Sequence, residues 1–69
     1  MPYATNEDLP ERIRLRLPAH AQDIFREAFN HAWTEYAADQ RSEEIAFRVA
    51  WSAVKKAGYA KHGDRWSRT

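Results

Sequence analysis

The 69-residue chain contains no cysteine, so neither a disulfide nor a thiolate metal site can stabilise it. It has no apolar run approaching the ~20 residues that cross a bilayer. Its first ten residues include two acidic and no basic ones, unlike a targeting segment. We therefore expect a cytoplasmic protein that is not inserted in a membrane.

The chain also has few glycines and little net charge. Gly58 and Gly63 are the only glycines, so no glycine-rich loop for phosphate binding is present. Eleven basic and ten acidic residues give a net charge of +1, which neither requires nor excludes an anionic partner. The charges are unevenly placed, because acidic residues dominate positions 35–44 and basic residues dominate positions 55–69.

Apolar residues make up 43% of the chain and aromatic residues 13%, which is too many for a disordered protein. The length fits one domain, over residues 1–69. A chain this short buries roughly 60% of its unfolded surface, so each large core side chain matters for stability.

Two segments have the three-and-four spacing of apolar residues that is typical of amphipathic helices. The first runs from Ala19 to about Tyr36. The second begins at Ser42, which we interpret as an N-cap, and ends at about Ala57 before a C-capping Gly58. Residues 37–41 lack an apolar anchor and are predicted to form a loop.

A shorter helix is predicted before these two. Thr5 and Asn6 precede two acidic residues, as at a helix start, and Pro10 suits a first turn. Pro18 ends the segment. Arginines alternate with apolar residues over 12–16, a pattern that also fits a short strand, but the two prolines favour a helix.

The C-terminal segment 59–67 has aromatic residues near both ends and a Gly-Asp pair between them, which indicates a small hairpin. Residues 2–4 could add a third short strand. The predicted fold is mainly α: a compact three-helix domain, with one short and two long helices and a small β-sheet. Its expected core is Leu17, Ile24, Phe25, Phe29, Trp33, Val49, Ala50, Trp51, Val54, Tyr59 and Trp66.

Metal and cofactor sites are not indicated. His20 and Asp23 lie three residues apart near a helix start, but a zinc site normally needs three or four ligands. A local hydrogen bond or a capping role for His20 is the simpler interpretation. His31 and His62 have no ligand-type residue at a suitable spacing, and both are expected to be exposed.

Catalytic groups are also missing. Ser42 and Ser52 have no accompanying base and orienting group. The acidic pairs at positions 7–8 and 43–44 are neighbours, which point about 100° apart on a helix and cannot share a substrate. We expect a protein that is not an enzyme and that has no cofactor.

Basic residues near the C-terminus are the candidate contact residues for a nucleic acid or another partner. Phosphates could be bound by cationic side chains while Trp66 or Tyr59 stacks on a base. The alternative is that the aromatic residues complete the core and the cations form an ordinary solvated rim. The candidate set is Lys55, Lys56, Lys61, Arg65 and Arg68.

Four sequence blocks together resemble the ChaB family of bacterial proteins. They are MPYAT with DLP at residues 1–10, LPAHAQDIF at 17–25, AFNHAW at 28–33, and VAWSAVK with the segment 59–66. The blocks occur in the family's order and cover nearly the whole chain. A match of several blocks in order is far more specific than any single motif.

The resemblance implies a compact helical fold with a small sheet and a role in regulating a sodium or calcium antiporter that exchanges protons. The partner would then be a protein, and we expect a monomer. Relatives in insect viruses and fusions to nucleic-acid-binding modules make DNA binding the alternative. The family's best-known member has a long, highly charged loop between the two main helices, which is linked to weak divalent-cation binding. This chain has only residues 37–41 there, so we expect no such binding.

Overall fold

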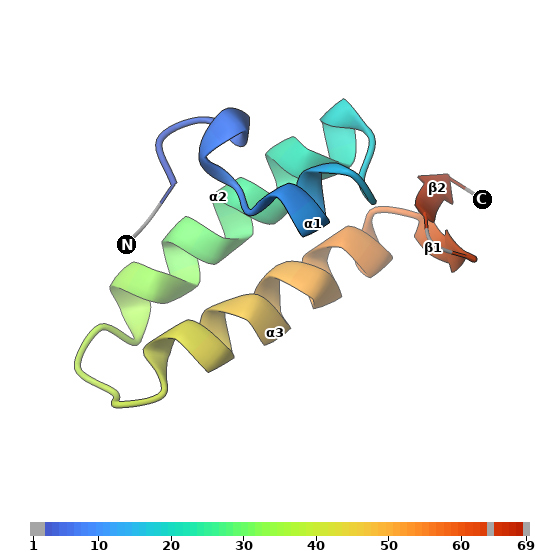
Figure 1. Ribbon diagram of the computed structural model, residues 1–69. Helices are drawn as coiled ribbons and strands as arrows, with labels where there is room; N and C mark the ends of the chain where they lie inside the picture. Colours follow the sequence, from blue (N-terminus) through green and yellow to red (C-terminus); the bar gives the residue numbers. More distant parts are fainter. Residues whose placement is uncertain (1–2, 64, 69) are drawn as a thin grey trace.

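The computed structural model describes residues 3–63 and 65–68. Two long helices, α2 (Ala19–Glu35) and α3 (Ser42–Lys56), run side by side (Figure 1). A short 3-10 helix, η1 (Asn6–Asp8), and the four-residue helix α1 (Glu11–Arg14) lie on one side of this pair. A hairpin of β1 (Tyr59–His62) and β2 (Arg65–Arg68) closes the end where α2 begins and α3 ends. The predicted mainly helical fold is confirmed.

The long helices match the predicted ranges to within one residue, but the start of α3 differs in detail. Arg41 occupies the N-cap position and Ser42 is the first helical residue, with no side-chain capping hydrogen bond. The Asp39 carboxylate instead accepts a hydrogen bond from the Arg41 backbone N–H at 2.7 Å. At the other end, Gly58 has φ 99°, a conformation that favours glycine just after a helix.

The predicted short helix is divided into two separate turns. Leu9 has ψ 147°, because the residue before a proline avoids the α region, and Pro10 then precedes α1. Thr5 and Asp8 form a capping box at the start of η1, where the Thr5 N–H donates to the Asp8 carboxylate at 3.1 Å. The prediction of helical structure in this segment is therefore right, but the prediction of one continuous helix is wrong.

The hairpin pairs Tyr59 with Arg68 and His62 with Arg65 in an antiparallel register. Among the described residues the sheet has these two strands alone. The predicted third strand is not seen at Tyr3 or Ala4, and its first residue, Pro2, lies outside the described residues, as does Asp64 of the predicted turn.

The backbone of Tyr3 is bound by a side chain instead of a strand. The Asn30 amide accepts a hydrogen bond from the Tyr3 N–H and donates one to the Tyr3 carbonyl oxygen, both at 2.7 Å. The Tyr3 ring packs on Phe29 at a centroid distance of 4.8 Å. Burial raises the pKa of the Tyr3 phenol above its usual 10.0, the negative charge of Glu43 adds to the increase, and Arg12 offsets it.

The core lies where α2 faces α3, with the N-terminal segment and β1 covering it. Alanines at the contact let the two helices approach closely, and Phe25 packs edge-on against Trp51 at 5.0 Å. The buried residues are Leu9, Ile13, Leu17, Ala21, Phe25, Phe29, Ala32, Ala46, Ala50, Val54 and Tyr59. Five other residues of the expected core are partly buried and pack against this cluster: Ile24, Trp33, Val49, Trp51 and Trp66.

Replacing Phe29 by alanine should lower the free energy of unfolding by about 3–5 kcal/mol, because this ring is 1% exposed and its loss leaves a cavity. The matched control is Leu15→Ala, which removes a side chain that is 67% exposed and should change stability by less than about 0.5 kcal/mol. Urea unfolding followed by circular dichroism measures both. Equal losses in the two variants would contradict this description of the core.

Candidate interaction surface

Arginines from two distant parts of the chain meet at the hairpin end of the molecule. A groove there is lined by Arg14 and Arg16, from α1 and the connection to α2, and by Arg65 and Arg68 of β2. Leu15 and Trp66 are among its apolar lining residues. A second hollow, lined by Arg12, Leu15, Arg16 and Arg65, adjoins it through shared residues. We call the two together the arginine groove.

Trp66 joins the two halves of the groove. Its backbone N–H donates a hydrogen bond of 2.7 Å to the carbonyl oxygen of Arg16. Its indole stacks on Trp51 of α3 at a centroid distance of 5.1 Å. Beside it, the Tyr59 hydroxyl lies 2.8 Å from Nδ1 of His20, which connects β1 to the start of α2. The hairpin is thereby fixed against both long helices.

The groove's arginines are exposed, and none of them pairs with a carboxylate of residues 3–63 or 65–68. Ion pairs in the part of the chain that the structure describes involve other groups, namely Arg26 with Asp23 and Arg48 with Glu44. His31 lies 3.5 Å from Glu35, a pair that is ionic only when the imidazole is protonated, so the sequence-based expectation of no carboxylate at a suitable spacing from His31 is wrong. Among the described side chains of the groove's arginines, that of Arg14 alone makes a hydrogen bond, 3.1 Å from Nε to the Leu9 carbonyl oxygen. Guanidinium groups stay protonated at any physiological pH. The groove is therefore a permanently cationic surface.

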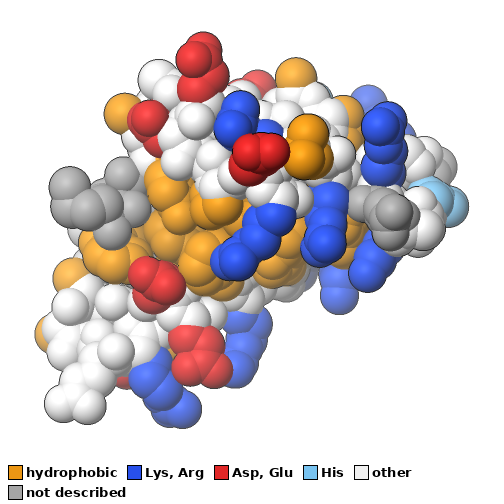
Figure 2. All heavy atoms as spheres, viewed as in Figure 1, with side chains coloured by type: hydrophobic (Ala, Val, Ile, Leu, Met, Phe, Trp, Pro, Cys, Tyr) orange, Lys and Arg blue, Asp and Glu red, His pale blue; other side chains and the backbone are white. Residues whose placement is uncertain are grey.

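Figure 2 shows how charged and apolar side chains are distributed over one face of the molecule. Most of the visible lysine and arginine side chains lie on the half toward the hairpin, whereas the acidic side chains lie on the other half together with a few basic ones. An apolar band is visible between the N-terminal segment and α3. On this face the apolar band lies in the middle of the molecule, and basic side chains border it on the hairpin side.

The contact residues expected from the sequence are only partly brought together. Arg65 and Arg68 line the groove, whereas Lys56 lines a separate hollow on α3 with Arg48 and Ser52. Lys55 and Lys61 are exposed and line neither of these hollows.

Sequence reasoning missed the arginines at positions 12, 14 and 16 as contact residues. Their alternation with apolar residues was the available signal. This alternation bears on secondary structure alone, because nothing in the local sequence indicates that β2 packs beside these arginines.

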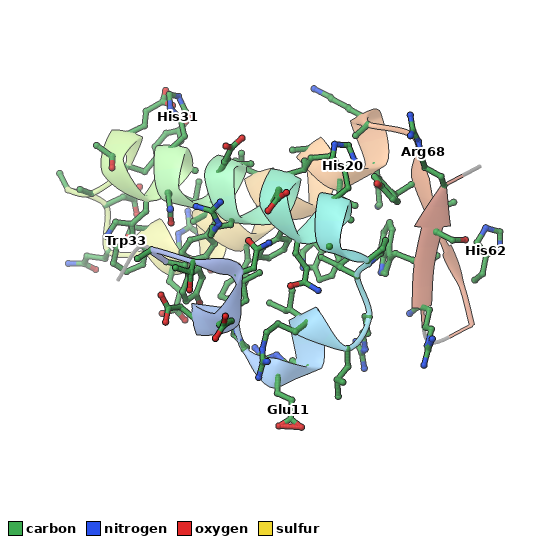
Figure 3. The ribbon with its side chains drawn as sticks, turned by 90° about the horizontal axis from the view of Figure 1, so that it is seen from above. Glu11, His20, His31, Trp33, His62 and Arg68 are labelled. Carbon is green, nitrogen blue, oxygen red and sulfur yellow. The ribbon has the colours of Figure 1, made fainter. Side chains whose placement is uncertain are left out.

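The histidines do not form a metal site. Figure 3 shows His20, His31 and His62 far apart, with His31 toward one end of the helix pair and His62 on the hairpin. No group of three or more histidine, cysteine or acidic residues able to hold a metal ion occurs within residues 3–63 and 65–68. His20 lies 2.8 Å from the Tyr59 hydroxyl instead, a contact between residues far apart in sequence and not the local hydrogen bond or cap that was expected.

Comparison with known proteins gives one consistent family. The chain matches the ChaB family model over residues 9–69. It is 51% identical to the "putative cation transport regulator ChaB" of Escherichia coli strain K12 and to that of Shigella flexneri, covering 96% of this chain and 95% of each relative. The solution NMR structure of a protein with the same name superposes with a TM-score of 0.84, at 49% identity and 99% coverage of both chains.

Calcium at low millimolar concentration should leave the NMR signals of Asp39, Glu43 and Glu44 unchanged. A calcium site needs six or more oxygen ligands converging from a turn, and the short segment 36–41 between the long helices contains one carboxylate. A magnesium titration under the same conditions is the control for nonspecific ionic effects. Saturable shifts at these residues with Ca²⁺ would contradict this expectation.

Proposed function

We propose that this chain, which belongs to the ChaB family, is a regulatory module that acts by binding another protein and not by catalysis. The proposal is supported by the name of its 51% identical relatives, which describes a regulator of cation transport. The observation that carries it is the arginine groove. It offers exposed arginines, without an ion-pair partner among the described residues, beside apolar surface, which suits recognition of an anionic partner.

The partner we propose is an antiporter that exchanges sodium or calcium for protons. No helix within the described residues is long and apolar enough to cross a membrane. We propose that the chain acts on a surface of the antiporter that faces water. We place that surface on the cytoplasmic side and propose that the chain binds it as a monomer.

Everted membrane vesicles test this function, because they expose the cytoplasmic face of an overproduced antiporter to added protein. The purified chain should change the rate of cation-dependent proton release by roughly fivefold, in a saturable manner. The variant with both Arg65→Glu and Arg68→Glu should have little effect, and vesicles without the antiporter are the control. An unchanged rate at saturating wild-type protein would contradict the proposal.

DNA binding is the second candidate function, and the unpaired arginines favour it because they can also bind phosphates. If four phosphates are contacted, affinity for a short duplex should fall roughly 100-fold between about 50 and 200 mM salt. Charge reversal at Lys55, Lys56 and Arg65 should abolish it. Fluorescence anisotropy measures both effects, and binding that is absent at low salt would eliminate this candidate.

A further inference from the structure

Leu15 is the most exposed large apolar side chain in the described part of the molecule, at 67%. It lies between two arginines in sequence, and it lines both parts of the arginine groove. Its neighbour Ile13 is 3% exposed, so the alternating pattern places one apolar side chain in the core and the next in solvent. An isolated exposed leucine is ordinary, but this one lies among arginines that form no ion pair with another described residue.

Carboxylates are a natural match for these cations. A guanidinium group can donate two parallel hydrogen bonds to one carboxylate, which gives directional recognition as well as charge attraction. Arg16 and Arg65 line both parts of the groove, and neither forms an ion pair or a side-chain hydrogen bond with another described residue. A partner's carboxylates would not have to displace an ion pair between these arginines and any described residue.

The aromatic rings of the groove favour a protein segment over single-stranded nucleic acid. Base stacking needs an open ring face. The Trp66 ring is partly buried and already stacks on Trp51. Tyr59 is 6% exposed, and its hydroxyl is bonded to His20. Binding to the phosphates of a duplex would use the cations alone and would give Leu15 no role.

We propose that the arginine groove binds an acidic peptide segment that places an apolar side chain against Leu15. The carboxylates of the segment pair with Arg16 and Arg65, and its apolar side chain covers Leu15. This inference deepens the proposed function and rests on it, since the segment belongs to the regulated protein partner. Charge steers the encounter, and the apolar contact distinguishes this segment from other polyanions.

Three fluorescein-labelled probes test the inference on the intact chain by anisotropy. The first is a twelve-residue peptide of alternating glutamate and serine with two central leucines. The second has serine in place of both leucines, and the third is a short DNA duplex. We expect the first peptide to bind about tenfold more tightly than the other two probes. Tighter binding of the duplex would overturn the proposal in favour of nucleic acid.

Surface variants locate the site. Combined Arg16→Glu and Arg65→Glu should weaken binding of the leucine peptide at least about tenfold. Leu15→Ser should lower the affinity for the leucine peptide several-fold without changing the affinity for the serine peptide. The matched control is Arg48→Glu, which reverses an exposed charge on α3 outside the groove and should leave affinity unchanged. Circular dichroism verifies that each variant is folded.

Chemical-shift mapping on the unmodified chain gives a result that does not depend on any variant. Addition of the leucine peptide should shift the amide signals of Leu15, Arg16 and Trp66. Shifts confined to α3, or an equal loss of affinity in Arg48→Glu, would overturn the proposal. If the peptide binds the groove but the antiporter is unaffected, the proposed regulation of the antiporter is contradicted and the groove assignment stands. If the antiporter responds but the peptide does not bind, the groove assignment is contradicted and the proposed regulation stands.

Discussion

The contact between Trp66 and the connection before α2 is the interaction on which the candidate surface depends. One hydrogen bond joins the Trp66 N–H to the Arg16 carbonyl oxygen at 2.7 Å, and the indole packs on Trp51 of α3. A two-stranded hairpin alone is at best marginally stable in water. Docked in this way, it is held against the helices and brings Arg65 and Arg68 beside the N-terminal arginines.

The helical core below this surface follows from elementary patterning. Apolar residues at i and i+4 appear in each buried stripe, for example Ala21, Phe25 and Phe29 on α2. Small side chains on α3 let the helices approach closely, and larger rings fill the remaining space. These regularities are local, which explains why the sequence alone predicts both long helices and their boundaries within one residue.

The parts that the sequence did not predict depend on contacts between distant residues. The N-terminal segment was expected to join a sheet, but the Asn30 amide meets both backbone groups of Tyr3 and replaces a strand partner. No periodicity reveals such a side-chain bridge. The arginine groove is similar, because Arg16 and Arg65 lie far apart in sequence and only the packing of the hairpin brings them together.

Hydrogen exchange of the Trp66 backbone amide in solution tests the central claim most directly, since its N–H bonds to Arg16 across the junction of the groove. Native-state exchange followed by NMR reports how often this contact opens. The account predicts that the Trp66 amide exchanges more slowly than an unprotected amide by about a hundredfold or more. Exchange at the rate of an unstructured peptide would show that the hairpin is not docked, and the arginine groove would not exist as described.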